Sequence, residues 1–184
     1  VAIWATNVPA WYITFWAATK IGAVLVTVNT AYKRHEADYL FRQSDTHTLV
    51  MVESCLDSNY KEIINEICPE IAKSKAGEPL HCKRLPFLRN VITVGFKQAG
   101  CLTFDEAMER GDLVPQEELN RMAARVRPDD VCNMQYTSGT TGFPKGVMLT
   151  SEEPKLVSEV YYTDRGRYAT GDFIKKKKRN HCWG

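Results

Sequence analysis

The most informative run in this chain of 184 residues is Thr137-Ser138-Gly139-Thr140-Thr141-Gly142-Phe143-Pro144-Lys145-Gly146. It places hydroxyl groups, glycines and one lysine in a single short segment. Glycine allows positive φ and close backbone approach, so successive N–H groups can converge on an anion. Hydroxyl groups add neutral donors, and the ammonium group of Lys145 supplies the positive charge that phosphate oxygens favour. The run therefore predicts a polyphosphate-binding loop.

The flanking residues indicate how this loop is held. Residues 131–136 and 146–150 both have the composition of short strands. Pro144 disfavours a helical conformation at Phe143, so a helix cannot run through the loop. The spacing also fits neither a Walker A loop nor a G-x-G-x-x-G dinucleotide loop. We expect a strand–loop–strand arrangement; the alternative is a flexible turn whose lysine is merely solvated.

Strand patterns alternate with helix patterns along residues 1–126. The expected strands are residues 1–4, 23–28, 48–52 and 90–94. The expected helices are residues 9–21, 35–43, 60–68, 104–110 and 116–126, with an irregular surface segment at residues 73–84. This alternation predicts an α/β fold with a mostly parallel sheet flanked by helices. Ligands of such sheets bind beyond the carboxyl ends of the strands, where the glycine-rich loop falls.

Charge and hydropathy bear on two classes of partner, nucleic acid and membranes. The run Lys175-Lys176-Lys177-Lys178-Arg179 contributes five positive charges to a formal net charge of +2. Because this run has no interleaved aromatic residues, it indicates a solvated chain end rather than a nucleic-acid site. Contact of the run with an anionic membrane surface is an open alternative. The apolar residues 8–28 are interrupted by Lys20 and Gly22, so a core helix followed by a strand is favoured over a membrane span.

The cysteines and tryptophans indicate an ordinary reduced core. Six cysteines are scattered without a C-x-x-C pair, so the spacing assigns no metal ligand and fits reduced thiols in a cytoplasmic protein. Trp4, Trp11 and Trp16 are interpreted as packing residues rather than an acyl-binding group.

Residues 136–146 resemble the phosphate-binding signature of the adenylate-forming (AMP-binding) enzyme superfamily. Residues 1–11, 20–30 and 129–131 resemble its acyl-CoA synthetase and fatty-acid–CoA ligase branch. The resemblance covers residues 1–150. It implies a partial N-terminal AMP-binding domain over residues 1–150, with the phosphate-binding loop at residues 137–146.

The resemblance also implies a reaction and its reactants. A small-molecule carboxylate, by resemblance a fatty acid, would attack the α-phosphate of ATP to give an acyl-adenylate, and coenzyme A would then take the acyl group. Mg²⁺ is implied alongside ATP. The residues implied to hold the ATP phosphates are Thr137, Ser138, Gly139, Thr140, Thr141, Gly142 and Lys145.

Beyond Thr150 the family pattern breaks. Residues 151–184 form an atypical, basic tail that we expect to be poorly ordered. Within it, residues 167–172 resemble the family's ribose-binding motif, which would make Asp172 a ribose ligand; an ordinary Gly-Asp turn is an equally good interpretation.

The family's catalytic lysine and the glutamate that helps to hold Mg²⁺ are absent, so no catalytic residue and no metal ligand is assigned. We expect a truncated and internally deleted ligase that is inactive alone. The alternatives are an ATP-binding module without ligase chemistry and a nonfunctional truncated product. The sequence sets neither the acyl length nor the oligomeric state.

Overall fold

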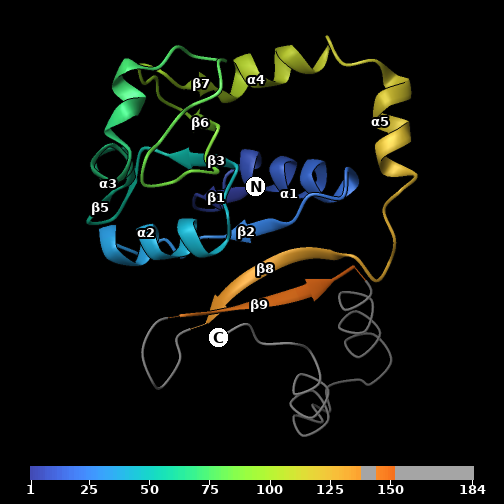
Figure 1. Cartoon of the computed structure of the whole chain (residues 1–184), viewed down its shortest axis with the longest axis horizontal. Helices are drawn as coiled ribbons and strands as arrows, with labels where there is room; N and C mark the ends of the chain where they lie inside the picture. Colours follow the sequence, from blue (N-terminus) through green and yellow to red (C-terminus); the bar gives the residue numbers. More distant parts are fainter. Residues whose placement is uncertain (138–143, 152–184) are drawn as a thin grey trace, which may run out of the picture.

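A seven-stranded sheet lies at the centre of the computed structural model, which describes residues 1–137 and 144–151 (Figure 1). From one edge to the other, its strands are β7 (Leu102–Thr103), β6 (Asn90–Val94), β3 (Thr48–Val52), β1 (Ala2–Trp4), β2 (Leu25–Thr27), β8 (Val131–Thr137) and β9 (Lys145–Thr150). Neighbouring strands are parallel throughout, except that β9 runs antiparallel to β8. The predicted α/β fold with a mostly parallel sheet is confirmed.

Helices cover both faces of this sheet. The described helices are α1 (Pro9–Lys20), α2 (Arg34–Gln43), α3 (Tyr60–Ile67), α4 (Phe104–Gly111) and α5 (Gln116–Ala123), with a short 3₁₀ helix η1 (Pro69–Lys73). In β1, the side chains of Ala2 and Trp4 join a buried cluster with α2 and α3, whereas Ile3 joins a second cluster with α1. Successive strand residues point to opposite faces, and both faces here are buried.

The helix boundaries follow local signals. Pro9 occupies the first turn of α1, where its missing N–H costs nothing. Asn59 caps α3 by accepting a hydrogen bond from the Glu62 N–H at 3.1 Å. Trp16 packs edge-on against the rings of Tyr12 and Phe15 but lies outside the core, because the residue is 55 % exposed.

Three short strands and the 3₁₀ helix η1 were not predicted from the sequence. The strands β4 (Ser54–Cys55) and β5 (Ser58–Asn59) form a hairpin, and β7 adds an edge to the main sheet. The hairpin turn holds Leu56 at φ +52°. Glycine or asparagine usually occupies such a position, so leucine gave no sequence signal for this turn.

Residues 8–28 form α1 and β2, the expected helix and strand of the core. Within the described part of the chain, no helix is both long and apolar enough to cross a membrane.

Candidate functional site

The candidate site is centred on the turn between β8 and β9. Thr137 ends β8, Lys145 begins β9, and the two residues are paired across the hairpin. Both side chains are exposed. The described flanks therefore have the expected strand–loop–strand arrangement. The remaining predicted phosphate ligands lie outside the described residues: Ser138, Gly139, Thr140, Thr141 and Gly142. The ribose candidate Asp172 and the tail from residue 152 onward also lie outside them.

This turn lies at the carboxyl edge of the parallel strands. β2 runs parallel to β8, with Thr27 opposite Gln135, so both strands end at the same edge of the sheet. Figure 1 shows the β8–β9 hairpin alongside β2, with the connection from β2 to α2 leaving at that edge. The end of β8 and residues 28–33 after β2 are therefore neighbours at the edge where parallel sheets bind ligands.

Two buried aromatic residues hold the segment at residues 28–33 in place. The Trp4 indole N–H donates to the Asn29 carbonyl oxygen at 3.1 Å, and the Tyr60 hydroxyl donates to the Thr30 carbonyl oxygen at 2.8 Å. The two rings are stacked, with their centroids 4.0 Å apart. The segment beside the loop is thus fixed from the core. Trp4 was predicted to be a packing residue, but nothing local in the sequence reveals its bond to Asn29 or the long-range bond of Tyr60.

Tyr136 and Gly146 face each other directly behind the loop. A Cβ atom placed on Gly146 would lie 3.3 Å from Tyr136 Cζ and 3.3 Å from Met134 Sδ, which is a tight contact. Glycine therefore lets β9 approach the phenol ring closely. Burial, and then the nearby phenol of Tyr39, raise the pKa of Tyr136 to about 12, so this hydroxyl stays neutral near pH 7.

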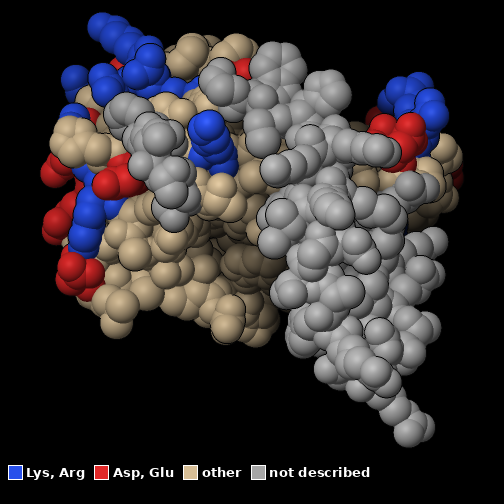
Figure 2. Space-filling view, turned by 90° about the horizontal axis from the view of Figure 1, so that it is seen from below, with Lys and Arg blue, Asp and Glu red and all other residues tan. Residues whose placement is uncertain are grey.

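The charges at this edge differ in how they are compensated. Lys33 Nζ lies 2.8 Å from a carboxylate oxygen of Asp57, and the hydrogen bond from Lys33 lowers the pKa of that carboxyl. Lys145, in contrast, forms no ion pair with any residue that the structure describes. Figure 2 shows one face on which Lys, Arg, Asp and Glu side chains gather along the left side, next to a tan surface without charged side chains. Among the described residues, nothing compensates the positive charge of Lys145 beside the loop, which suits an anionic ligand.

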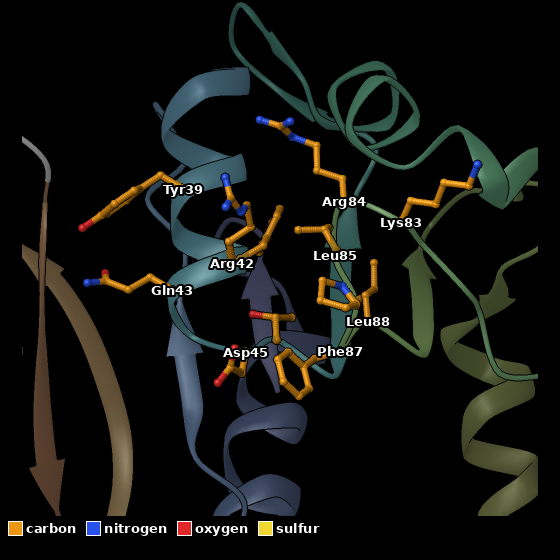
Figure 3. Close-up of a pocket in the computed structure, with 12 residues that line it drawn as sticks. Tyr39, Arg42, Gln43, Asp45, Lys83, Arg84, Leu85, Phe87 and Leu88 are labelled. Carbon is orange, nitrogen blue, oxygen red and sulfur yellow. The ribbon is translucent and has the colours of Figure 1, made fainter.

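A separate groove of about 660 Å³ lies between α2 and residues 83–88 (Figure 3). It is lined in part by Asp45 and Thr46, which precede β3, so it lies at the amino edge of the sheet. The guanidinium of Arg84 is already bound to the Asp38 carboxylate by two hydrogen bonds of 2.5 and 2.6 Å. The charge of Arg84 is thus compensated, and the groove lies at the amino edge, opposite the β8–β9 turn. We therefore do not assign the phosphate site to this groove.

The mostly parallel sheet and the hairpin with its hydroxyl- and glycine-rich turn define a domain of the adenylate-forming class. The chain belongs to the family described as AMP-binding enzymes, whose model matches residues 1–173.

Relatives agree with this assignment. YngI of Bacillus subtilis (strain 168), whose name marks it as a proposed acyl-CoA synthetase, is 46 % identical over 151 residues, or 82 % of this chain and 27 % of YngI. The mitochondrial medium-chain acyl-CoA ligase ACSF2 of Danio rerio is 30 % identical over 161 residues, or 88 % of this chain and 26 % of that ligase.

A solved structure shares the fold. The anthranilate CoA ligase AuaEII, crystallised with anthranoyl-AMP, superposes with a TM-score of 0.61 at 20 % identity, over 87 % of this chain and 27 % of that protein. The chain thus spans about a quarter of the length of these relatives.

Proposed function

We propose that this chain provides the ATP-phosphate-binding part of an enzyme that activates a carboxylic acid to an acyl-adenylate and then to an acyl-CoA. The observation that carries the proposal is the position of Lys145. Its ammonium group has no ion-pair partner among the described residues, and it stands beside Thr137 at the ligand-binding edge of the sheet. A triphosphate would supply the missing negative charge.

The proposed ligand residues follow the loop sequence. Lys145 would neutralise phosphate oxygens, and hydroxyl and backbone N–H groups would donate to them from Thr137, Ser138, Gly139, Thr140, Thr141 and Gly142. Asp172 is proposed as a ribose ligand on the basis of residues 167–172 alone. Residues 1–150 would form the partial AMP-binding domain and residues 151–184 the tail.

The described ends of the loop do not fit Mg²⁺ as a protein-held ion. Thr137, Pro144 and Lys145 offer a hydroxyl group and a cation but no carboxylate, whereas Mg²⁺ in proteins is usually held by carboxylates together with phosphates. We therefore assign these residues to the phosphates, and Mg²⁺ remains a proposed companion of ATP.

The names of the relatives support the substrate class. ACSF2 is named a medium-chain acyl-CoA ligase, and the AuaEII crystal contains an acyl-adenylate, anthranoyl-AMP. We propose a fatty acid as the carboxylate and coenzyme A as the acyl acceptor. Because the sequence assigns no catalytic residue, we further propose that this chain alone binds ATP without completing ligation, which makes an ATP-binding module the second candidate.

A competition experiment tests the phosphate site. ATP, inorganic tripolyphosphate and AMP are titrated separately into the full chain in a calorimeter. A grip on the phosphates predicts that tripolyphosphate competes with ATP and that AMP binds at least about tenfold more weakly, since it lacks the β- and γ-phosphates. Failure of ATP to bind, or equal affinity for AMP and ATP, would contradict the site.

A second assay separates the two candidate functions. Exchange of labelled pyrophosphate into ATP with octanoate present would show that the chain carries out adenylation. Saturable ATP binding without such exchange is the result expected of a binding module.

A further inference from the structure

The end of α3 contains a group of potential ligands that the sequence spacing did not indicate. Cys68 follows the last residue of α3, Glu70 lies in the first turn of η1, and Cys82 comes from the irregular segment before β6. Their sulfur and carboxylate oxygen atoms all lie within 4.8 Å of one another. Only the fold brings Cys82 next to the other two residues.

Glu70 has an oxygen atom that lacks a partner. Its Oε1 accepts a hydrogen bond from the Lys83 N–H at 3.2 Å, which orients the carboxylate. Its Oε2 is buried and has no hydrogen-bond partner among the residues that the structure describes. Burying a carboxylate oxygen without a partner is costly, and a bound cation is one way to remove that cost.

The two sulfur atoms lie in a protected environment. The exposed fractions of Cys68 and Cys82 are 0 % and 4 %. The Leu85 N–H donates to Cys82 Sγ at 3.3 Å. Backbone N–H groups thus support both the carboxylate, through Lys83, and one thiol, through Leu85. Outer hydrogen bonds of this kind are typical around metal ligands, because they orient the ligand atoms.

An ion can reach this group from solvent. A hollow of about 320 Å³ opens on the surface beside Glu70. Its lining residues are Glu70, Lys73, Ser74, Lys75, Glu78, Pro79 and His81. Glu70 therefore lies both in the wall of an open hollow and beside two buried thiols, as a ligand at the mouth of an ion site would.

We propose that Cys68, Glu70 and Cys82 bind one zinc ion. Two sulfur ligands favour a thiophilic ion such as Zn²⁺ over Mg²⁺ or Ca²⁺. Zn–S bonds of about 2.3 Å in tetrahedral geometry place two sulfur atoms about 3.8 Å apart, so at most small movements of the side chains complete the site. Binding releases the two thiol protons, and water from the hollow takes the fourth position. The ion would tie the end of α3 to the segment that precedes β6.

The test uses the full chain, reduced and freed of metal. Zn²⁺ is titrated in competition with a chromophoric chelator, and Cd²⁺ serves as a spectroscopic probe because cadmium thiolates have an ultraviolet charge-transfer band. We expect one ion per chain, a cadmium band of two thiolates, and a thermal unfolding midpoint that rises with zinc concentration.

Matched variants assign the ligands. Cys82→Ser should abolish the two-thiolate band, and Glu70→Gln should raise the zinc dissociation constant about 10- to 100-fold while the cadmium band remains. Cys55→Ser removes a cysteine outside the cluster and should leave binding unchanged, as should Cys182→Ser in the tail. The Glu70→Gln variant keeps the test decisive even where Cys82→Ser fails to fold, because it alters only the carboxylate beside the hollow.

Three results would overturn the proposal. The first is the absence of a cadmium band in the reduced wild-type chain. The second is a loss of binding in Cys182→Ser, which would place the ion at the tail. The third is a Cys68–Cys82 disulfide found in the oxidised chain together with failure of the reduced chain to bind zinc, which would make the pair a redox couple instead.

Discussion

Replacing Tyr60 with phenylalanine removes one hydroxyl group from the structure that supports the candidate site. The Tyr60 side chain is fully buried, and its hydroxyl donates to the Thr30 carbonyl oxygen at 2.8 Å. The ring itself stacks on Trp4, and phenylalanine preserves that contact. The substitution therefore removes the hydrogen bond between the core and the segment at residues 28–33, together with the interaction of the same hydroxyl with the Cys55 side chain.

The expected loss follows from that bond. A buried hydrogen bond contributes about 0.5–1.5 kcal/mol, and a carbonyl left without its donor adds to the cost, so we expect about 1–2 kcal/mol in the free energy of unfolding. For a chain of this size such a loss lowers the melting temperature by roughly 2–8 °C. Urea unfolding followed by circular dichroism measures it, and the denaturant slope should stay unchanged because the surface exposed on unfolding is the same.

Tyr12→Phe is the matched control. The Tyr12 side chain is 64 % exposed, so removing its hydroxyl should change the free energy of unfolding by no more than about 0.5 kcal/mol. Equal effects of the two substitutions would refute the claim that Tyr60 anchors this segment.

Three further substitutions test the packing and the titration behaviour. Gly100→Ala should lower the free energy of unfolding by more than about 2 kcal/mol, because φ is +78° and a Cβ atom would clash with the Ile71 carbonyl oxygen. Gly111→Ala is the control, because a Cβ atom at this position of α4 would meet no neighbouring atom. It should be neutral or stabilise the fold by up to about 1 kcal/mol, and equal losses of unfolding free energy in the two alanine variants, measured by urea unfolding, would contradict this. The folded pKa of Tyr136, about 12, exceeds its ordinary value of 10.0, so its stabilisation is full below pH 10 and is lost as pH rises toward 12. The Tyr136→Phe variant should therefore lose less stability than the wild type between pH 10 and 12. Urea midpoints that fall equally with pH in the two proteins would contradict the raised pKa of Tyr136.

The sequence predicts the main strands because their composition is unambiguous. Residues 48–52 and 90–94 are strands with those bounds, since continuous runs of apolar and β-branched residues bury both faces. Pro9 and Pro69 mark helix boundaries within a residue or two, because proline cannot continue a helix from within.

The missed elements are those without local signals. β7 has only two residues, and its pairing with β6 depends on the path of the whole chain. The β4–β5 turn uses Leu56 at positive φ, where sequence patterns lead one to look for glycine or asparagine. Trp16 packs on other rings of α1 but outside the core, because the face of α1 that meets the sheet is set by the fold.

Some features of the candidate site were likewise predictable from the sequence, and others were not. The flanks of the phosphate loop were predictable because glycine, threonine, proline and lysine specify a turn between strands. The anchoring of residues 28–33 by Trp4 and Tyr60 was not, since it joins distant parts of the chain. The group formed by Cys68, Glu70 and Cys82 also escapes any spacing rule, because an irregular segment carries Cys82 to its partners.

The affinity of the Lys145→Ala variant for ATP tests the central claim most directly. Removing a charged hydrogen-bond donor should weaken binding by about 1.5–3 kcal/mol, which is roughly a 10- to 150-fold rise in the dissociation constant measured by calorimetry. Lys20→Ala changes another exposed lysine, at the end of α1; it removes the same charge at the opposite edge of the sheet and should leave the affinity unchanged. An unchanged affinity in Lys145→Ala, or an equal loss in both variants, would contradict the phosphate-binding role of the β8–β9 turn.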